Sequence, residues 1–420
     1  MKIALVSDWY RPRVGGIEFQ IESLAARLVA AGHAVTVITP TPGGDADGAA
    51  GISLNSAVET EATRSRSQLR GVEATRSRSQ LREAEASTAE SGVRVHRLPA
   101  VLCPGCGLMW TPRAFRELRV QLSAGDFDVV HAHSSIISPA AYGALAIAVR
   151  QGLPAVVTVH SIWGHYRHLL TAIDRAVRWS RWPVVFSAVS ECAARDLRLR
   201  LGATPVAILP NAVDPAEWNV VPAPPADTIS IACVMRMARR KRGRALVALM
   251  PRVLAALPAR ASRLRLRIAG DGPERPEMER LADRLRVAGS IDFLGQLDHA
   301  GVRQLFAGCS GFVLPTRLEA FGIAALEARA AGLPVVAMRA GGVAEFVRHE
   351  QEGLLADDDD DLAAQLVRLV TEPGLRERIA VHNRATPVEF TWDRTLAAHL
   401  AAYERASRLV GRFLPPPVFP

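Results

Sequence analysis

Hydrophobic residues occur along the chain in short runs of strand length, separated by segments long enough to form helices. The first run, Lys2–Ser7, is followed by Gly15-Gly16 and by a segment whose apolar residues Ile21, Leu24 and Leu28 fall on one helical face. This spacing predicts an amphipathic helix that ends at Gly32. Further strand runs follow in the first half of the chain: Ala34–Thr39, Val129–His131, Ala155–His160, Val184–Val189 and Val206–Leu209. The alternation predicts a parallel, doubly wound sheet.

The same alternation starts again after a segment rich in proline and alanine, Pro215–Ala226. The second set of strand runs is Ile229–Val234, Leu264–Ala269, Ile291–Leu294, Phe312–Leu314 and Val335–Met338. The chain has 420 residues, more than the roughly 250 that a single hydrophobic core holds. We therefore predict an α/β protein of two Rossmann-like domains, 1–215 and 226–390. We also predict a C-terminal helix over 391–410 that packs back toward the first domain.

One segment interrupts this pattern. Residues 43–91 contain few large apolar side chains, and the sequence EATRSRSQLR occurs at 61–70 and again at 73–82. Mixed charge without aromatic residues predicts a mobile insertion outside the core. The repeat indicates a local duplication, because a solenoid requires several stacked units.

The composition narrows the class of protein. Almost all of the formal net charge of +9 comes from arginine, since lysine occurs only at positions 2 and 241. A basic surface attracts phosphates, nucleic acid or anionic lipid, and charge alone leaves all three open. Cys103 and Cys106 have metal or redox spacing without a second pair, so we interpret them as an incidental loop pair. The few cysteines, the early Asp8 and the lack of a membrane-length apolar window lead us to expect a soluble cytoplasmic protein.

Several candidate binding residues come directly after predicted strands, where open α/β sheets bind their ligands. Gly15-Gly16 lets backbone amides approach an anion, although a tight turn without a ligand explains the pair as well. His131, His133 and His160 lie at strand ends, where a structural role is equally open.

Cations follow the first strand of the second half. Arg236 and Lys241 suit the binding of a pyrophosphate. The run Arg239–Arg242 also suits a solvated basic patch or a contact with nucleic acid, so the charges alone leave these alternatives open.

The segment EAFGIAALE, at 319–327, places two glutamates around the start of a predicted crossover helix. A helix that begins near Phe321 directs the amides of Gly322 and Ile323 toward an anion, with Glu319 beside that anion. At about 1.5 Å per residue, Glu327 lies roughly 10 Å further along, a distance that suits the ribose of a nucleotide. Two ordinary helix glutamates explain an isolated pair equally well.

EAFGIAALE resembles the E-x7-E signature of retaining glycosyltransferases of family 4, which have the GT-B fold, two Rossmann-like domains that face each other across a cleft. The similarity covers nearly the whole chain outside the insertion. It extends to Gly15-Gly16-Ile17, His160 in VTVHS, Ser190 in AVSE, Pro210–Asp214, IAGDGP at 268–273, and Gly341-Gly342 with Glu345. The resemblance implies a UDP- or GDP-linked sugar donor held by the second domain and an acceptor held by the first. It also implies transfer with retention at the anomeric carbon, and neither a metal nor another cofactor.

The resemblance also assigns roles to residues. The implied catalytic residues are Glu319, His160, Arg236 and Lys241. The implied donor-binding residues are Gly16, Arg236, Lys241, Phe321, Gly322, Ile323 and Glu327. Within these sets Arg236 and Lys241 bind the pyrophosphate, Glu327 binds the ribose, and Glu319 and His160 meet the donor sugar. In the mechanism usual for this family the leaving phosphate helps to deprotonate the acceptor, so no carboxylate nucleophile is required.

Two positions depart from the family pattern. Ala212 replaces a frequent glycine, and Arg242 replaces the glycine that usually follows the lysine. The acidic run Asp357–Asp361 is a further candidate for metal binding, but we interpret it as a solvated cap of the helix that follows.

A second level of resemblance concerns the acceptor. The segments SDWYRPRVGGIE, HAHSS at 131–135 and TVHSIWG at 158–164 are similar to the enzymes that transfer N-acetylglucosamine to phosphatidylinositol. The overall layout resembles the bacterial mannosyltransferase that acts on the same lipid. A lipid acceptor at an anionic membrane is implied, with peripheral association and without a nucleic-acid partner. A nucleotide-sugar epimerase of the same fold and a non-enzymatic basic surface-binding protein are the alternatives.

One predicted helix bears on the membrane. It follows Thr111-Pro112 and carries Arg113, Arg116 and Arg119 beside apolar residues, which are Phe115, Leu118 and Leu122. Such a helix suits a membrane interface, and an ordinary amphipathic surface helix has the same pattern.

Overall fold

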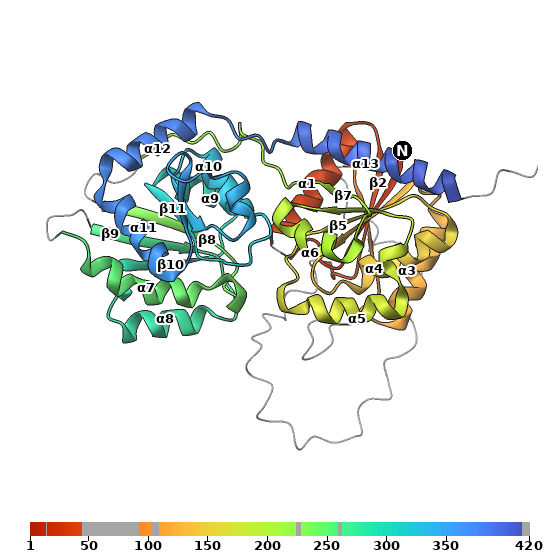
Figure 1. The fold of residues 1–420 in the computed structure, drawn as a ribbon, viewed down its shortest axis with the longest axis horizontal. Helices are drawn as coiled ribbons and strands as arrows, with labels where there is room; N and C mark the ends of the chain where they lie inside the picture. The colour runs from red at the N-terminus through yellow and green to blue at the C-terminus, as the bar shows by residue number, and fades with distance from the viewer. Residues whose placement is uncertain (14, 44–91, 102–108, 224–227, 259–262, 414–420) are drawn as a thin grey trace, which may run out of the picture.

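The computed structural model describes residues 1–13, 15–43, 92–101, 109–223, 228–258 and 263–413. The chain forms two α/β domains side by side, each built on one parallel sheet (Figure 1). Most of the predicted insertion 43–91, including its repeat, lies outside the described residues, as do Cys103 and Cys106. The prediction of two doubly wound parallel sheets is confirmed.

The N-terminal sheet has seven strands in the order β3-β2-β1-β4-β5-β6-β7, and every neighbouring pair is parallel. Its strands are β1 Lys2–Ser7, β2 Ala34–Thr39, β3 Arg94–Arg97, β4 Val129–Ser134, β5 Ala155–Val159, β6 Val185–Ala188 and β7 Val206–Ile208. Its helices are α1 Gly16–Ala30, α3 Pro112–Ala124, α4 Pro139–Gln151, α5 Arg167–Val177 and α6 Glu191–Leu201. Buried side chains of α3, α4 and α6 share one core, whereas α1 belongs to the core on the opposite face of the sheet.

The C-terminal sheet has six parallel strands in the order β10-β9-β8-β11-β12-β13. Its strands are β8 Thr228–Val234, β9 Arg263–Ala269, β10 Ile291–Gly295, β11 Gly311–Leu314, β12 Val335–Met338 and β13 Gly353–Ala356. Its helices are α7 Gly243–Ala255, α8 Arg275–Arg284, α9 His299–Ala307, α10 Ile323–Ala330, α11 Asp359–Thr371 and α12 Pro373–Ala385. The long apolar runs of its central strands fit a sheet that is covered by helices on both faces.

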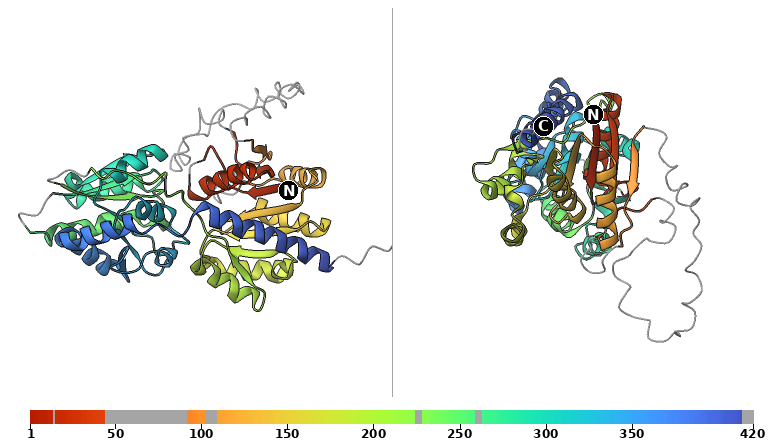
Figure 2. Two further views of the ribbon diagram at one scale, coloured as in Figure 1. Left: turned by 90° about the horizontal axis from the view of Figure 1, so that it is seen from above. Right: turned by 90° about the vertical axis from the view of Figure 1, so that its right-hand side faces the viewer.

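The chain passes between the domains twice. It first leaves the N-terminal domain after β7, and it returns before the last helix, α13 Trp392–Phe413, which lies along the N-terminal domain (Figure 2). Tyr403 of α13 is fully buried in the same core as α1. The two passages touch, because the Val213 amide donates to the Phe390 carbonyl over 3.1 Å and Val213 pairs with Thr391 in a parallel bridge.

Candidate functional site

The first residues of two helices meet where the domains face each other. A Cβ atom added to Gly16, the first residue of α1, would lie only 3.0 Å from Cδ1 of Ile323, the first residue of α10. α10 begins at Ile323 rather than near Phe321, because Gly322 has a φ of +94°, outside the helical region and favourable for glycine. The free amides and positive dipole ends of both helices therefore converge, an arrangement that attracts an anion.

A basic side chain and an acidic side chain are paired beside these helix ends. The Lys241 ammonium, at the end of the short turn η4 (Arg239–Lys241), lies 2.6 Å from Oε2 of Glu319. The Glu319 carbonyl accepts a hydrogen bond from the Gly342 amide over 2.8 Å, which fixes the backbone of Glu319. Both members of the pair are partly exposed, so an incoming phosphate has access to the ammonium.

Arg236, which follows β8, is exposed and faces the loop between β1 and α1. Arg13 of that loop stacks on Trp9, with its guanidinium carbon 3.6 Å from the ring centre, and forms an ion pair of 3.3 Å with Glu18. Burial lowers the pKa of Arg13, and the positive charge of Arg236 contributes to the same shift against the attraction of Glu18. Nη1 of Arg13 is buried without a hydrogen-bond partner in the described part of the chain. Sequence analysis missed Arg13, and its place shortly before Gly15-Gly16 was the available signal.

Glu327 lies within α10 and is almost completely buried. Burial, together with the negative charge of Glu217, raises the pKa of the Glu327 carboxyl to about 8. Among the described residues, the Glu327 carboxyl accepts no hydrogen bond from the protein. Its acceptor capacity is therefore free for a ligand.

The strand-end histidines form a buried cluster within the N-terminal domain. Nδ1 of His133 lies 3.0 Å from Nε2 of His160, and the His160 amide donates to the Ser134 carbonyl over 2.8 Å. Burial, with a contribution from His399 of α13, lowers the pKa of His160 to about 3. Within the described ranges, Nε2 of His133 and Nδ1 of His160 have no partner, and both residues line a cavity of about 10 Å³ together with His399 and Thr395.

Hydrogen bonds determine which nitrogen of His131 carries the proton. The Ser187 hydroxyl donates to the Val157 carbonyl, so the Thr158 hydroxyl must donate to Ser187 over 2.8 Å. Thr158 then accepts from Nε2 of His131 over 2.7 Å, and Nδ1 of His131 accepts from the Tyr403 hydroxyl over 2.9 Å. His131 is therefore neutral and serves the packing of α13 on the sheet.

The two domains are also held together by polar contacts that sequence analysis did not assign. The Ser190 hydroxyl, at the start of α6, donates to the Ala320 carbonyl of the C-terminal domain. The Glu345 carboxylate accepts from the amides of Glu191 and Cys192, over 3.0 and 2.8 Å. Glu345 thus binds the amino end of a helix in the other domain, where a negative charge is favourable. Ser190 and Glu345, both positions of the family motifs, therefore each bind a backbone group of the other domain.

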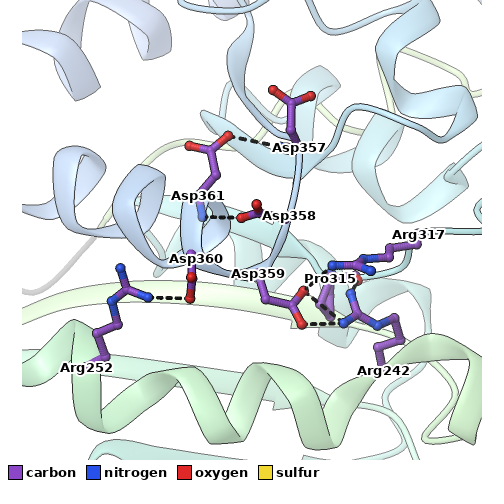
Figure 3. A network of polar contacts seen from close by, with 9 residues as sticks. All are labelled: Arg242, Arg252, Pro315, Arg317, Asp357, Asp358, Asp359, Asp360 and Asp361. Atoms are coloured by element: carbon purple, nitrogen blue, oxygen red, sulfur yellow. Dashed lines mark hydrogen bonds and ion pairs between the residues drawn. The ribbon is translucent and has the colours of Figure 1, made fainter.

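Arg242 shows why its position usually holds glycine. Its φ of 60° and ψ of 30° lie in the left-handed region, where a residue with a Cβ atom is strained. The guanidinium binds both carboxylate oxygens of Asp359, over 2.8 and 2.6 Å, and the Pro315 carbonyl over 3.1 Å (Figure 3). These contacts join the start of α7 to the start of α11 and offset the strain.

The acidic run before and within α11 serves the helix. The Asp358 side chain accepts from the Asp361 amide over 2.8 Å and caps the helix, while Asp360 pairs with Arg252 (Figure 3). No group of acidic, histidine or cysteine side chains suited to a metal ion occurs in the described residues. The expectation that no metal takes part stays a prediction.

The second departure from the family pattern, Ala212, is accommodated in a buried position. Its amide donates to Oε1 of Gln20 over 3.0 Å, and its carbonyl accepts from Nε2 of Gln20 over 2.9 Å. The Gln20 amide of α1 thereby satisfies both backbone groups of Ala212 without requiring glycine there.

The structure favours a surface-helix interpretation for α3. Its apolar residues Ala114, Leu118 and Leu122 are buried in the domain core. Arg113, Arg116 and Arg119 are exposed, and so are the apolar residues Trp110 and Val120, while the main apolar face of the helix packs on the core. No helix within the described ranges has the length and apolarity to span a membrane.

Comparisons with known proteins identify the class. The family model described as Glycosyltransferase Family 4 matches residues 14–217, and the model described as Glycosyl transferases group 1 matches residues 228–372. The chain is 30% identical over 346 residues to the D-inositol 3-phosphate glycosyltransferase of Actinosynnema mirum, covering 75% of this chain and 80% of that protein. This protein therefore belongs to glycosyltransferase family 4, as predicted.

Other relatives agree in fold and family. The chain is 25% identical over 429 residues to one of the subunits of phosphatidylinositol N-acetylglucosaminyltransferase from Arabidopsis thaliana, covering 99% of this chain and 84% of that protein. Among solved structures, Anabaena HepE in complex with UDP and glucose superposes with a TM-score of 0.67 at 18% identity, covering 96% of this chain and 98% of that chain. The fold is accordingly GT-B, and the protein is a glycosyltransferase.

Proposed function

We propose that this glycosyltransferase transfers a sugar, with retention, from a UDP- or GDP-linked donor to a hydroxyl of a phosphatidylinositol-like lipid at a membrane surface. The observation that carries the proposal is the meeting of Gly16 and Ile323 beside the Lys241–Glu319 pair. Two helix amino ends and a partly exposed cation at one point between the domains suit a diphosphate held from both sides.

The donor enters this site through its diphosphate. Its phosphate oxygens accept from the amides at the start of α10 and from Arg236 and Lys241. Lys241 then exchanges Glu319 for the phosphate, which frees the Glu319 carboxylate to accept hydrogen bonds from the donor sugar. The unpaired Glu327 carboxyl is available for the ribose hydroxyls. His160 directly follows the strand β5, and we propose that it meets the donor sugar.

Transfer breaks the bond between the anomeric carbon and the diphosphate oxygen. The acceptor oxygen attacks the same carbon from the side of the leaving group, and its proton passes to an oxygen of the departing diphosphate. The main requirement is stabilisation of the negative charge on that diphosphate, which Arg236, Lys241 and the helix amides provide. No carboxylate is required on the opposite face of the sugar, and a glycosidase would need a carboxylate pair across the sugar ring.

The acceptor assignment follows from the relatives. The Arabidopsis relative is part of a phosphatidylinositol N-acetylglucosaminyltransferase, and the Actinosynnema relative acts on D-inositol 3-phosphate by its name. Both names contain an inositol phosphate, and in the first name this group is part of a lipid. We therefore propose an inositol-phosphate headgroup on a lipid as the acceptor, with peripheral membrane association and no nucleic-acid partner.

A thermal-shift screen with UDP, GDP and their common sugar conjugates tests donor binding. The matching nucleotide raises the melting temperature, because a ligand that binds only the folded state stabilises it. The selected donor is then incubated with vesicles containing phosphatidylinositol, and NMR of the glycolipid product reports the anomeric configuration. An inverted product would exclude the retaining mechanism. Isomerised or hydrolysed donor without any need for an acceptor would instead favour the epimerase, and binding of anionic lipid without nucleotide binding would favour a non-enzymatic surface-binding protein.

A further inference from the structure

α5 carries an exposed apolar stripe. Tyr166, Leu169, Ile173 and Val177 are 47%, 45%, 40% and 51% exposed, respectively. Their spacing of three and four positions places them on one face along the whole helix. Single exposed apolar residues are common, but a continuous row on a helix that is otherwise polar marks a contact surface. We refer to these residues as the α5 stripe.

The side of α5 next to the stripe anchors the helix to the domain. Leu170 is buried in the core. The buried Asp174 carboxylate accepts from the Ser180 amide and hydroxyl, each over 2.8 Å, and from Nε of Arg200 over 2.5 Å. The helix is therefore fixed in one orientation, with the α5 stripe directed outward. α5 lies along the lower edge of the N-terminal domain in Figure 1.

Three basic residues lie near the carboxyl end of α5. Arg175 and Arg178 are exposed on the helix and its end, and Arg181 follows in the next turn. None of the three forms an ion pair with a described acidic residue, and Asp174, the one acidic residue in the α5 sequence, is buried. An apolar row on one face of a helix, with unpaired cations on the polar face and at the helix end, is the pattern of a helix that lies in the interface of an anionic bilayer.

The α5 stripe begins at the edge of the candidate site. The turn η2 (Gly164–Tyr166) connects α5 to the strand that ends before His160. A Cβ atom added to Gly164 would lie 3.4 Å from Cδ1 of Leu318, an exposed residue that immediately precedes Glu319. The row of apolar side chains is thus next to the place where the two domains meet at the Lys241–Glu319 pair.

We infer that the α5 stripe is the surface by which this protein docks on an anionic bilayer, so that a lipid headgroup enters the site between Gly164 and Leu318. The part of this inference that brings a lipid headgroup into the site rests on the proposed function. The docking surface itself rests on the exposure, spacing and charge of α5, which do not depend on that function.

Co-sedimentation of the full chain with vesicles of equal parts phosphatidylcholine and phosphatidylglycerol tests the inference. The test variant is Leu169→Glu with Ile173→Glu. The matched control is Leu199→Glu with Val381→Glu, two apolar residues outside α5 that are 77% and 59% exposed. We expect the parent and the control to bind alike and the test variant to bind at least about tenfold more weakly, because two apolar contacts are lost and two like charges face the lipid. Equal melting temperatures confirm that all variants are folded.

A charge variant provides a second test. Arg175→Glu with Arg181→Glu should remove the preference for these vesicles over vesicles of phosphatidylcholine alone. If the parent does not bind anionic vesicles, or the Leu169 and Ile173 variant binds as the parent does, the inference is wrong. Thermal stabilisation by UDP and GDP is measured on the same variants. If neither UDP nor GDP stabilises the parent, the proposed function is wrong, whereas docking that depends on the α5 stripe is unaffected.

Discussion

Lys241 Nζ lies 2.6 Å from Oε2 of Glu319, a carboxylate 78 residues further along the chain. The pair brings the turn after β8 against the segment before α10. A diphosphate that binds here must take the place of the carboxylate beside Lys241. The two glutamates of EAFGIAALE are therefore expected to respond differently to substitution.

Glu327→Ala should weaken the binding of the matching nucleoside diphosphate about ten- to a hundredfold. The substitution removes hydrogen bonds to a charged acceptor, which contribute roughly 1.5 to 3 kcal/mol. Glu319→Ala should leave that affinity equal or slightly higher, because Lys241 loses its competing partner, and should instead lower turnover with the nucleotide sugar. Calorimetry with the diphosphate and a transfer assay measure both effects. Equal losses of diphosphate affinity in the two variants would contradict the proposed division of roles.

Diphosphate binding should depend on the ionisation of Glu327. Its pKa of about 8 means that the carboxyl is mostly protonated at neutral pH, and hydrogen bonds from two ribose hydroxyls favour its ionised form, so binding is coupled to release of a proton. Affinity should therefore fall as the pH is lowered below about 8, by up to about tenfold per pH unit. Ionisation of the phosphate also changes the affinity with pH, but it does so equally in the parent and in the Glu327→Gln variant. This variant therefore serves as the control. Calorimetry over this pH range should give a smaller slope for the variant, and identical slopes would exclude the effect.

The buried histidines should make the folded state sensitive to acid. Burial lowers the pKa of His399 to about 4 and that of His160 to about 3, whereas an unfolded histidine has a pKa of about 6.5. Below about pH 6.5 the unfolded state binds protons that the folded state does not, so stability falls as the pH falls toward these values. At about pH 5 each such residue accounts for a loss of about 2 kcal/mol. Urea unfolding of His399→Gln at neutral and acidic pH should show a smaller loss than the parent, and an equal loss would contradict the prediction.

Arg242 offers a paired test of backbone strain. Arg242→Ala loses the contacts to Asp359 and Pro315 but keeps a Cβ atom in the left-handed region. Arg242→Gly loses the same contacts and relieves the strain, so it should be more stable than the alanine variant by about 1 kcal/mol. The free energy of unfolding in urea measures the difference. An alanine variant as stable as the glycine variant would show that the strain is negligible.

Both sheets were predictable from the sequence because buried parallel strands are continuous apolar runs. Two edge strands were missed. Arg94–Arg97 has Val95 as its one apolar residue, and Gly353–Ala356 has only two large apolar residues, Leu354 and Leu355. Both lie at the outer edge of a sheet, where only one neighbour constrains the strand.

Residues near one another in the sequence were easier to assign than contacts between the domains. The spacing of Glu319 and Glu327 predicted one glutamate before a helix and one inside it, although α10 begins at Ile323, so Glu319 lies four residues ahead of the helix. The Lys241–Glu319 pair and the binding of the α6 amides by Glu345 depend on how distant segments approach, which no local pattern encodes. For the same reason α3 was a candidate membrane helix: its apolar periodicity is real, but only the fold shows that the domain core already buries it.

The bridge between Val213 and Thr391 ties both passages between the domains at one point. Sliding one domain past the other would stretch two segments at once, whereas rotation about the bridge strains neither. Rotation of one domain against the other about this bridge is therefore the relative motion that the two connections allow most easily. The contacts of Ser190 and Glu345 join the same two domains at other points, so a rotation that separates the domains would break them. A rotation about the bridge would bring Gly16 and Ile323 back to the same relative position whenever the domains close.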